Sequence, residues 1–371
     1  MNWRGTALRL CRVTGLPILE PFVRLAAGED PKEQFQNIFK FIVIPIIATL
    51  FFIGLWSLAA SNIKTDSAEL PSPSSTWAAA KELWASHRAQ KIADATAITE
   101  ERAKAKGFMQ QAKAAEKQAA SATGNDQKRA LANAEVYKKK ALQAANFQPS
   151  SAPTFVDQTW RSIGTVFVGF FIATIIAVPL GILCGMSPIF NAAMNPIIQL
   201  FKPVSPLAWL PIASIVIIWW YSGDETGDAL FSRAFLISAT TVSLCSLWPT
   251  LVNTALGVST VNKDYLNVAK VLKLSWWQTL CKIIFPASLP LMFAGLRISL
   301  GVGWMVLIAA DMLAQNPGLG KFVWDMFQNG SNNTYAKIAV AVLVIGFVGL
   351  ILDRIMVFLR NLVSFGNDAA S

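Results

Sequence analysis

Six apolar runs, each about 20 residues long or longer, dominate this chain of 371 residues. A run of that length is what an α-helix needs to cross the hydrocarbon core of a bilayer. Because lipid offers the backbone no hydrogen-bond partner, each run is predicted to be a helix. The chain is therefore expected to be an all-α, polytopic membrane protein whose six transmembrane helices lie near residues 39–60, 163–186, 197–221, 234–256, 289–313 and 338–359.

Composition and charge support this class. The chain is 54% hydrophobic and only 15% charged, which is too apolar for an ordinary soluble domain. Its net charge of +10 does not indicate nucleic acid, because the basic residues flank the apolar runs or lie in one Ala/Lys-rich block. Basic residues precede the first run, fill the segment after the fourth and close the last, whereas Asp224, Glu225 and Asp228 follow the third. Both termini are thus expected on the cytoplasmic side of a bacterial inner membrane.

The first 38 residues lack the compact apolar core and small-residue cleavage site of a removable signal peptide. The first run is therefore expected to remain as an anchor, preceded by an interfacial helix or a partly ordered tail. The four cysteines have no pairwise metal spacing, so neither a disulfide nor a metal site is expected. They are predicted to be small buried hydrophobic residues: Cys11, Cys184, Cys245 and Cys281.

Five segments are expected: a cytoplasmic segment 1–38, a first transmembrane helix 39–60, a periplasmic segment 61–157, a five-helix core 158–362 and a cytoplasmic tail 363–371. In the periplasmic segment, Thr76 is expected to cap a short helix that runs through Trp84. The Ala/Lys-rich stretch that follows, to Gln148, predicts two antiparallel helices joined at Gly124. This hairpin either braces a binding protein or a neighbouring subunit, or is a solvated extension.

A polar segment at residues 262–275 separates the fourth and fifth runs. It contains Asn267-Val-Ala-Lys-Val-Leu-Lys-Leu-Ser275 and is followed by Ile283-Ile-Phe-Pro286. Basic and apolar residues alternate at helical spacing, which suits a helix that enters a cleft on a soluble partner but also a merely interfacial amphipathic helix. The residues concerned are Leu266, Asn267, Val268, Ala269, Lys270, Leu272, Lys273 and Pro286.

This segment resembles the cytoplasmic coupling loop of ATP-binding-cassette importer permeases, whose pattern is Glu-Ala-Ala, three residues, Gly, nine residues and Ile-x-Leu-Pro. Asn267, Val268 and Ala269 occupy the first three places, Lys273 occupies the Gly place and Pro286 the last. The replacements are similar to those of the nitrate and bicarbonate branch of that family. The resemblance favours coupling to an ATPase over a merely interfacial helix.

Two further motifs resemble the same family. Lys202-Pro-Val-Ser-Pro-Leu-Ala-Trp-Leu-Pro211 is similar to the family's Arg/Lys-x-x-Pro-Pro-Leu-Ala-Trp-Leu-Pro, with Ser205 in place of the first Pro of the pair. Broken backbone at membrane depth is tolerated where protein or a water-filled cavity surrounds it, so the third run is expected to line a pathway. The fifth run and the Gly318-Leu-Gly320 after it match a second block, in which Asp311 replaces the usual Glu.

Several polar residues in these runs have two interpretations. Lys202 and Arg297 either contact a passing anion or extend their charged ends to the membrane surface. Asp311 is either functional or a structural partner within the bundle. The predicted substrate-path residues are Lys202, Pro206, Trp209, Arg297, Trp304 and Asp311.

The resemblance implies the permease subunit of an ATP-driven importer with a type I fold that transports a small inorganic anion by alternating access, nitrate first. Bicarbonate, cyanate, sulfonate and taurine are the alternative substrates, and a membrane-anchored scaffold acting through the hairpin is the alternative outside transport. The implied partners are ATPase subunits, a second permease copy, a periplasmic or lipid-anchored substrate-binding protein and membrane lipid. The sequence has no Gly-rich phosphate-binding loop, so ATP hydrolysis is expected in separate subunits and the chain itself is expected to be neither an enzyme nor a cofactor protein.

Overall fold

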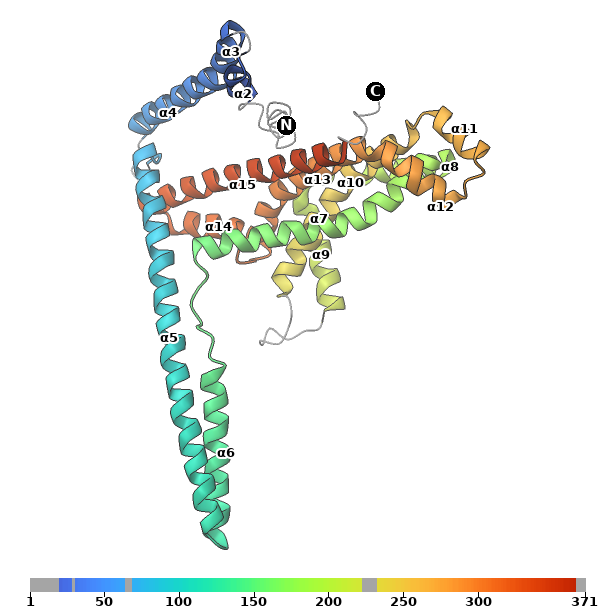
Figure 1. Cartoon of the computed structure of the whole chain (residues 1–371). Coiled ribbons are helices and arrows are strands. Elements are labelled where there is room, and N and C mark those ends of the chain that lie inside the picture. Colours follow the sequence, from blue (N-terminus) through green and yellow to red (C-terminus); the bar gives the residue numbers. More distant parts are fainter. Residues whose placement is uncertain (1–19, 29–30, 64–68, 222–231, 365–371) are drawn as a thin grey trace. The chain divides into compact units, whose positions relative to one another are not determined.

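The computed structural model describes residues 20–28, 31–63, 69–221 and 232–364 (Figure 1). In this part of the chain the regular structure is helical, without a β-strand, so the predicted all-α class is confirmed. The helices are α2 (Glu20–Ala26), α3 (Pro31–Ile38), α4 (Ile44–Asn62), α5 (Pro73–Ser121), α6 (Asn125–Ala145), α7 (Phe155–Met186), α8 (Pro188–Phe201), α9 (Pro206–Trp220), α10 (Arg233–Ser259), α11 (Lys263–Val271), α12 (Trp276–Thr279), α13 (Phe285–Leu313), α14 (Leu319–Asn329) and α15 (Asn332–Ser364). Two π-helical turns, η2 (Phe39–Val43) and η3 (Leu280–Ile284), join α3 to α4 and α12 to α13.

Five helical stretches of the described chain are long and apolar enough to cross a membrane: Pro31–Asn62, Phe155–Met186, Arg233–Ser259, Trp276–Leu313 and Asn332–Val363. The third predicted run, residues 197–221, is not one helix. The pair α8 and α9 shares it and bends by 105° between Phe201 and Pro206. The ring of a proline removes an intrahelical donor and clashes with the carbonyl four residues earlier, which explains the break. With this bent pair counted as one span, the predicted six spans are found.

The chain divides into two compact units, of which the smaller is residues 80–156. Helix α5, which leads into it, begins at Pro73 and continues to Ser121, so the expected short helix ending at Trp84 is wrong. The cap of this helix is Ser72 and not Thr76, because the Oγ of Ser72 accepts a hydrogen bond from the Ser75 N–H at 3.2 Å. No proline follows Trp84 within α5, and the stretch is rich in Ala, Lys and Glu, so the helix continues through its single glycine, Gly107.

Helices α5 and α6 run side by side as the predicted hairpin (Figure 1). Their contact consists of alanines with a partial seven-residue repeat, typical of paired helices; those almost fully buried are Ala105, Ala112, Ala115, Ala119, Ala134, Ala141 and Ala144. Lys138 of α6 forms an ion pair with Glu116 of α5 at 2.6 Å. The hydrogen bond to Glu116 raises the pKa of the Lys138 ammonium. The hairpin thus has a thin alanine core and a charged exterior.

The larger unit contains the membrane spans and is centred on α7, α10 and α13. Helix α7 presents a small residue every four positions, at Gly169, Ala173, Ala177 and Gly181. A Cβ on Gly181 would lie 2.6 Å from the Cβ of Thr254 on α10, so only glycine permits this approach. Small residues that let helix backbones approach closely are typical of packing within membranes.

A side-chain hydroxyl repairs the helix ladder where Pro249 interrupts α10. The Thr250 N–H donates to Ser299 Oγ of α13 at 3.0 Å, and Ser299 Oγ donates to the carbonyl of Ser246 at 2.5 Å. In a regular helix the amide of Thr250 would bond directly to that carbonyl. Ser299 is fully buried, and its hydroxyl therefore both satisfies the broken ladder and joins α13 to α10.

The cysteine prediction holds for Cys184, which is buried, but not for Cys281, which is exposed. Cys245 is half-buried. The exposed position of Cys281 follows from its place in η3, outside the central bundle. Cys11, most of the predicted interfacial segment and the acidic loop after the third run lie outside the described residues.

Candidate functional site

The bend between α8 and α9 is built by a cap and two prolines. Ser205 caps α9 by accepting a hydrogen bond from the Leu207 N–H at 3.3 Å, and Pro206 occupies the first turn, where a missing N–H costs nothing. Lys202 ends α8 with an exposed side chain and has no anionic partner among the described residues. The bend thus combines a free ammonium group with an interrupted backbone.

An aromatic cluster packs behind this bend. The ring of Phe201 lies 5.5 Å from that of Trp209 on α9 and stacks 6.1 Å from that of Trp248 on α10. The indole N–H groups of Trp209 and Trp248 are both buried without a hydrogen-bond acceptor in the described chain. A buried donor without an acceptor costs about 1–3 kcal/mol. Each of these two indole N–H groups would gain free energy by donating to a polar acceptor once a movement of the helices exposed it.

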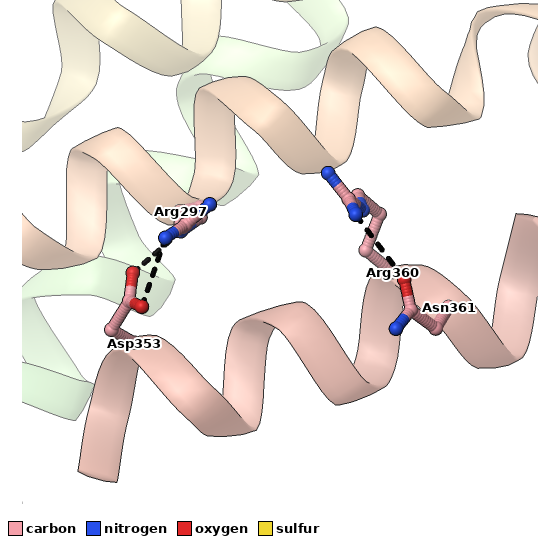
Figure 2. Close-up of polar contacts among 4 residues, drawn as sticks. All are labelled: Arg297, Asp353, Arg360 and Asn361. Atoms are coloured by element: carbon pink, nitrogen blue, oxygen red, sulfur yellow. Dashed lines mark hydrogen bonds and ion pairs between the residues drawn. The ribbon is translucent and has the colours of Figure 1, made fainter. Parts of the chain in front are cut away.

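Arg297, the second basic candidate, has a partner in the structure. Its guanidinium donates two hydrogen bonds to the carboxylate of Asp353, Nε to Oδ1 at 2.5 Å and Nη2 to Oδ2 at 2.9 Å (Figure 2). The pair links α13 to α15, and both side chains are about two-fifths exposed, at 43% and 38%. In a bidentate pair of this kind, two N–H groups of the planar guanidinium each donate to one oxygen of the carboxylate. Arg297 is thus engaged with Asp353, which the sequence reading did not select.

Trp304 also joins α13 to α15. Its ring is almost fully buried, and its Nε1 donates to the carbonyl of Ile345 at 2.9 Å. The ring lies against Gly349, where a Cβ would come within 3.2 Å of it. The structure therefore places Trp304 in helix packing.

Asp311 lies at the end of α13 and is fully buried. Ser162 of α7 donates to its Oδ2 at 2.7 Å, and the Nδ2 of Asn316 donates to its Oδ1 at 2.7 Å. Ser238 of α10 is a third polar side chain, and the second hydroxyl, beside this carboxylate. Asp311 has no ion-pair partner among the described residues. The contacts tie the turn after α13 to α7 and α10, as the structural interpretation of Asp311 expects.

The Gly-Leu-Gly motif fits against this carboxylate. A Cβ on Gly318 would lie 2.1 Å from Asp311 Oδ2, and one on Gly320 would lie 1.9 Å from the Ile308 carbonyl oxygen. The Leu319 N–H donates to Ser162 Oγ at 2.8 Å, so the same hydroxyl holds both the acid and the loop. Asp311, Gly318 and Gly320 are therefore parts of one tightly packed turn after α13.

The predicted coupling segment folds as helix α11, a turn and the short helix α12. Asn262 caps α11 by accepting a hydrogen bond from the Asp264 N–H at 2.9 Å. The helix faces two ways. Ala269, 3% exposed, is buried against the rest of this chain, and Leu266 packs on the cluster of Val258 and Ile284. The outward apolar residues are Val268, Val271 and Leu272, which are 52%, 81% and 63% exposed.

The turn after α11 explains the place occupied by Lys273. Its φ of +52° is in the left-handed region that favours glycine. The Leu274 N–H donates to the Ala269 carbonyl and the Lys273 N–H to the Lys270 carbonyl, both at 3.0 Å. These two bonds define a Schellman helix ending, whose left-handed position is usually glycine. A Lys at this position retains the ending at a cost in strain.

Ser275 and Gln278 form a capping box that starts α12, with Gln278 N donating to Ser275 Oγ at 3.3 Å and Ser275 N to Gln278 Oε1 at 2.9 Å. The π-helical turn η3 follows, and Pro286 lies in the first turn of α13. Asn267 and Lys270 remain exposed on α11. A rigid, doubly capped connection thus links the exposed face of α11 to a membrane span.

The family model described as "Binding-protein-dependent transport system inner membrane component" matches residues 177–364, half of the chain. The chain belongs to this family. The match covers α8 to α15 and most of the second half of α7, and it leaves out the hairpin.

Among its relatives, the nitrate import permease protein NrtB of Synechocystis sp. is 39% identical over 206 residues, which are 56% of this chain and 69% of that protein. The bicarbonate transport system permease protein CmpB of the same organism is 38% identical over 210 residues, 56% of this chain and 69% of that protein. The taurine transport system permease protein TauC of Escherichia coli is 34% identical over 174 residues, 46% of this chain and 58% of that protein. The predicted resemblance to the nitrate, sulfonate and taurine permeases is confirmed.

The sequence reading missed three features of this site. Asp353 interrupts the last apolar run, and an acid in one span with an Arg in another is the pattern that should have suggested a pair. Ser162, Asn316 and Ser299 gave no such pattern, because single hydroxyl and amide residues are common in membrane helices. Val271 was passed over although it continues the apolar spacing of Val268.

Proposed function

We propose that this chain is the permease subunit of an ATP-driven importer of a small inorganic anion, with nitrate as the substrate. The observation that supports coupling to an ATPase is the folded α11 segment, which is seated on its own chain by Leu266 and Ala269 and presents Val268, Val271 and Leu272 outward. Apolar side chains in an amphipathic helix are the usual anchors in a groove of a partner protein. The ATPase subunits, a second permease copy and a substrate-binding protein complete the proposed assembly.

The choice of substrate rests on the relatives. NrtB and CmpB are 39% and 38% identical to this chain, and TauC is 34% identical. Bicarbonate is therefore the second candidate. Either monovalent anion must climb about 2.3 kcal/mol per 100 mV to enter a cell with a negative interior. Uptake against that potential requires an energy source, which ATP hydrolysis in partner subunits would supply.

The proposed anion contacts lie at the bend between α8 and α9. Lys202 is exposed and is therefore able to donate to an oxyanion, whereas the Trp209 indole N–H is buried without an acceptor in the described chain and would donate only after movement of the bend uncovers it. Pro206 holds the bend open at the start of α9. Arg297 is a weaker candidate because Asp353 already occupies its guanidinium.

In the proposed cycle, closure of the ATPase subunits displaces α11, and the capped connection through α12 and η3 transmits this motion to α13. The contacts of Ser299 with Thr250 and Ser246 then move α10 together with α13. The bent pair packs on these helices and opens the pathway alternately to the two sides. The coupling segment is cytoplasmic in this arrangement, as are both termini.

Uptake of labelled nitrate and bicarbonate into proteoliposomes that contain the complete complex tests the proposal. Lys202→Gln should lower uptake roughly tenfold, because a charge-assisted contact is worth about 1.5–3 kcal/mol. Lys202→Arg should retain most of the activity because it keeps the charge. Equal rates for Lys202→Gln and the unchanged protein would remove Lys202 from the pathway.

A second pair of variants tests coupling. Val268→Asp with Leu272→Asp should abolish both ATPase co-purification and uptake, because two carboxylates would be buried in an apolar contact. Replacement of residues 88–148 by a short Gly/Ser linker tests the hairpin separately and should leave uptake intact. Loss of uptake on hairpin removal with the folded core retained would show that the hairpin takes part in transport.

A further inference from the structure

A cavity of about 430 Å³ lies between the coupling segment and the ends of two membrane spans. Gly185 and Met186 at the end of α7 and Val258 and Ser259 at the end of α10 form one wall. The opposite wall is formed by α11, α12 and η3. Its volume is within the range of about 300–1,000 Å³ typical of ligand pockets.

The floor of this cavity is apolar. Val258 and Ile284 are buried at 6% and 5% exposure, and Leu266 and Met186 pack against them. Ser259 and Thr279 also line the cavity, and each already donates its hydroxyl hydrogen to the backbone of its own helix. An occupant in contact with the floor must therefore be mainly apolar.

Two lysines give the cavity a positive rim. Lys263 and Lys270 are separated by seven residues, so they lie on one face of α11 about 10 Å apart along its axis. No carboxylate of the described residues lines the cavity, and the nearest acid in sequence, Asp264, is exposed outside the lining. Neither lysine has an ion-pair partner among the described residues. The rim is thus an uncompensated site for an anion.

We propose that this cavity binds the headgroup of an anionic phospholipid. Its phosphate would lie between Lys263 and Lys270, its glycerol region would contact the apolar floor, and its acyl chains would remain in the bilayer. Basic pockets between transmembrane helices on the cytoplasmic side are known to suit such headgroups. The location at the ends of α7 and α10 puts the cavity at the membrane boundary, and its cytoplasmic side rests on the orientation proposed above.

The position of the site gives it a consequence for coupling. A headgroup in the cavity would fill the space between α11 and the span ends, so that displacement of α11 reaches α7 and α10 directly. Anionic lipid would therefore strengthen the link between ATP hydrolysis and uptake without contacting the transported anion. The lipid acts here on a coupling free energy between two sites.

The test measures lipid retention on the permease assembled with its ATPase subunits in nanodiscs that contain equal amounts of phosphatidylglycerol and phosphatidylcholine. Native mass spectrometry should show preferential retention of phosphatidylglycerol. The double variant Lys263→Gln with Lys270→Gln should lower this preference at least tenfold. Lys273→Gln with Lys282→Gln is the matched control, because it removes the same charge from lysines that do not line the cavity.

Ala269→Leu adds bulk to the cavity wall without a change in charge and should also lower retention, while elution as a monodisperse complex verifies that each variant folds. Equal phosphatidylglycerol retention in the two double variants would overturn the proposal. Loss of the lipid when inorganic phosphate is added would assign the rim to a free anion. The same measurement on the permease alone is the comparison for the partner: retention there that disappears in the assembled complex would assign the cavity to the ATPase. Either result overturns the lipid site. Because no uptake is measured, failure here leaves the transport proposal untouched.

Discussion

The bundle of α7, α10 and α13 and the hairpin of α5 and α6 both use small residues for close packing, but they differ in what surrounds those residues. In the bundle, glycines are interleaved with buried hydroxyls such as Ser162, Thr250 and Ser299, all at 0% exposure. In the hairpin, the interior is alanine and the polar side chains are outside. Close approach of helix backbones is therefore achieved in two different surroundings, lipid around the bundle and water around the hairpin.

The difference follows from where hydrogen bonds can be made. Water satisfies exposed polar groups around the hairpin, so its interior needs only apolar contact and its helices rest largely on the helix propensity of Ala, Lys, Glu and Gln. Lipid satisfies none, so the bundle places the Ser299 hydroxyl against the carbonyl and amide that Pro249 separates. Substitutions that look alike should thus have opposite effects in the two regions.

The largest contrast is expected between two glycines. Gly318→Ala would place a Cβ 2.1 Å from Asp311 Oδ2, and we expect it to destabilise the bundle by about 3 kcal/mol. Gly107→Ala, in open space on α5, should instead stabilise the hairpin by about 1 kcal/mol. Size-exclusion chromatography after heating in detergent measures the first change, and amide hydrogen exchange measures the second. A fully stable Gly318→Ala protein would contradict the packed turn.

The ion pair between Arg297 and Asp353 sharpens the contrast with the hairpin's pair of Lys138 and Glu116. Arg297→Gln or Asp353→Asn should leave an unpaired charge in a membrane span, at a cost of about 2.5 kcal/mol on insertion scales. Lys138→Gln should change thermal stability little, because its pair is exposed to water.

The charge-reversed double variant Arg297→Asp with Asp353→Arg distinguishes pairing from anion contact. If the two residues act as a pair, the double variant should recover much of the thermal stability and nitrate uptake that each single variant loses. Recovery of stability without uptake would return Arg297 to the list of anion contacts. Together with the single variants Arg297→Asp and Asp353→Arg, the double variant closes a double-mutant cycle that gives the coupling energy.

The sequence predicted the parts of the fold that depend on composition and period. Apolar length located the spans, and the Ala/Lys-rich stretch around Gly124 located the hairpin, because both signals are repeated over many residues. The continuous α5 was missed because a cap at Thr76 and an end at Trp84 were inferred from single residues, which are weak indicators of boundaries.

The sequence predicted those parts of the site that lie within a short sequence motif. The prolines before Leu207 predicted a break but not its 105° angle, which depends on how α8 and α9 pack on neighbouring helices. Arg297 was recognised as a charge in a span, but its partner is 56 residues away and no local pattern connects the two. The network of Asp311 likewise depends on Ser162, which is 149 residues away.

The smallest expected contrast concerns two of the turns with positive φ, one at Lys273 in the larger unit and one at Gly124 in the hairpin. Lys273→Gly should stabilise the end of α11 by roughly 0.5–1 kcal/mol, because relief of left-handed strain is partly offset by the greater freedom of glycine in the unfolded chain. Gly124→Ala should destabilise the hairpin by at least about 1 kcal/mol, because the φ of +67° and ψ of −127° at Gly124 lie in a region that residues with a Cβ avoid. Hydrogen exchange at the Leu274 amide, which bonds to the Ala269 carbonyl, measures the first change.

Lys273→Ala is the control, since it removes the charge but keeps the backbone strain. If Lys273→Ala stabilised the protein as much as Lys273→Gly, charge repulsion and not backbone conformation would limit this helix ending.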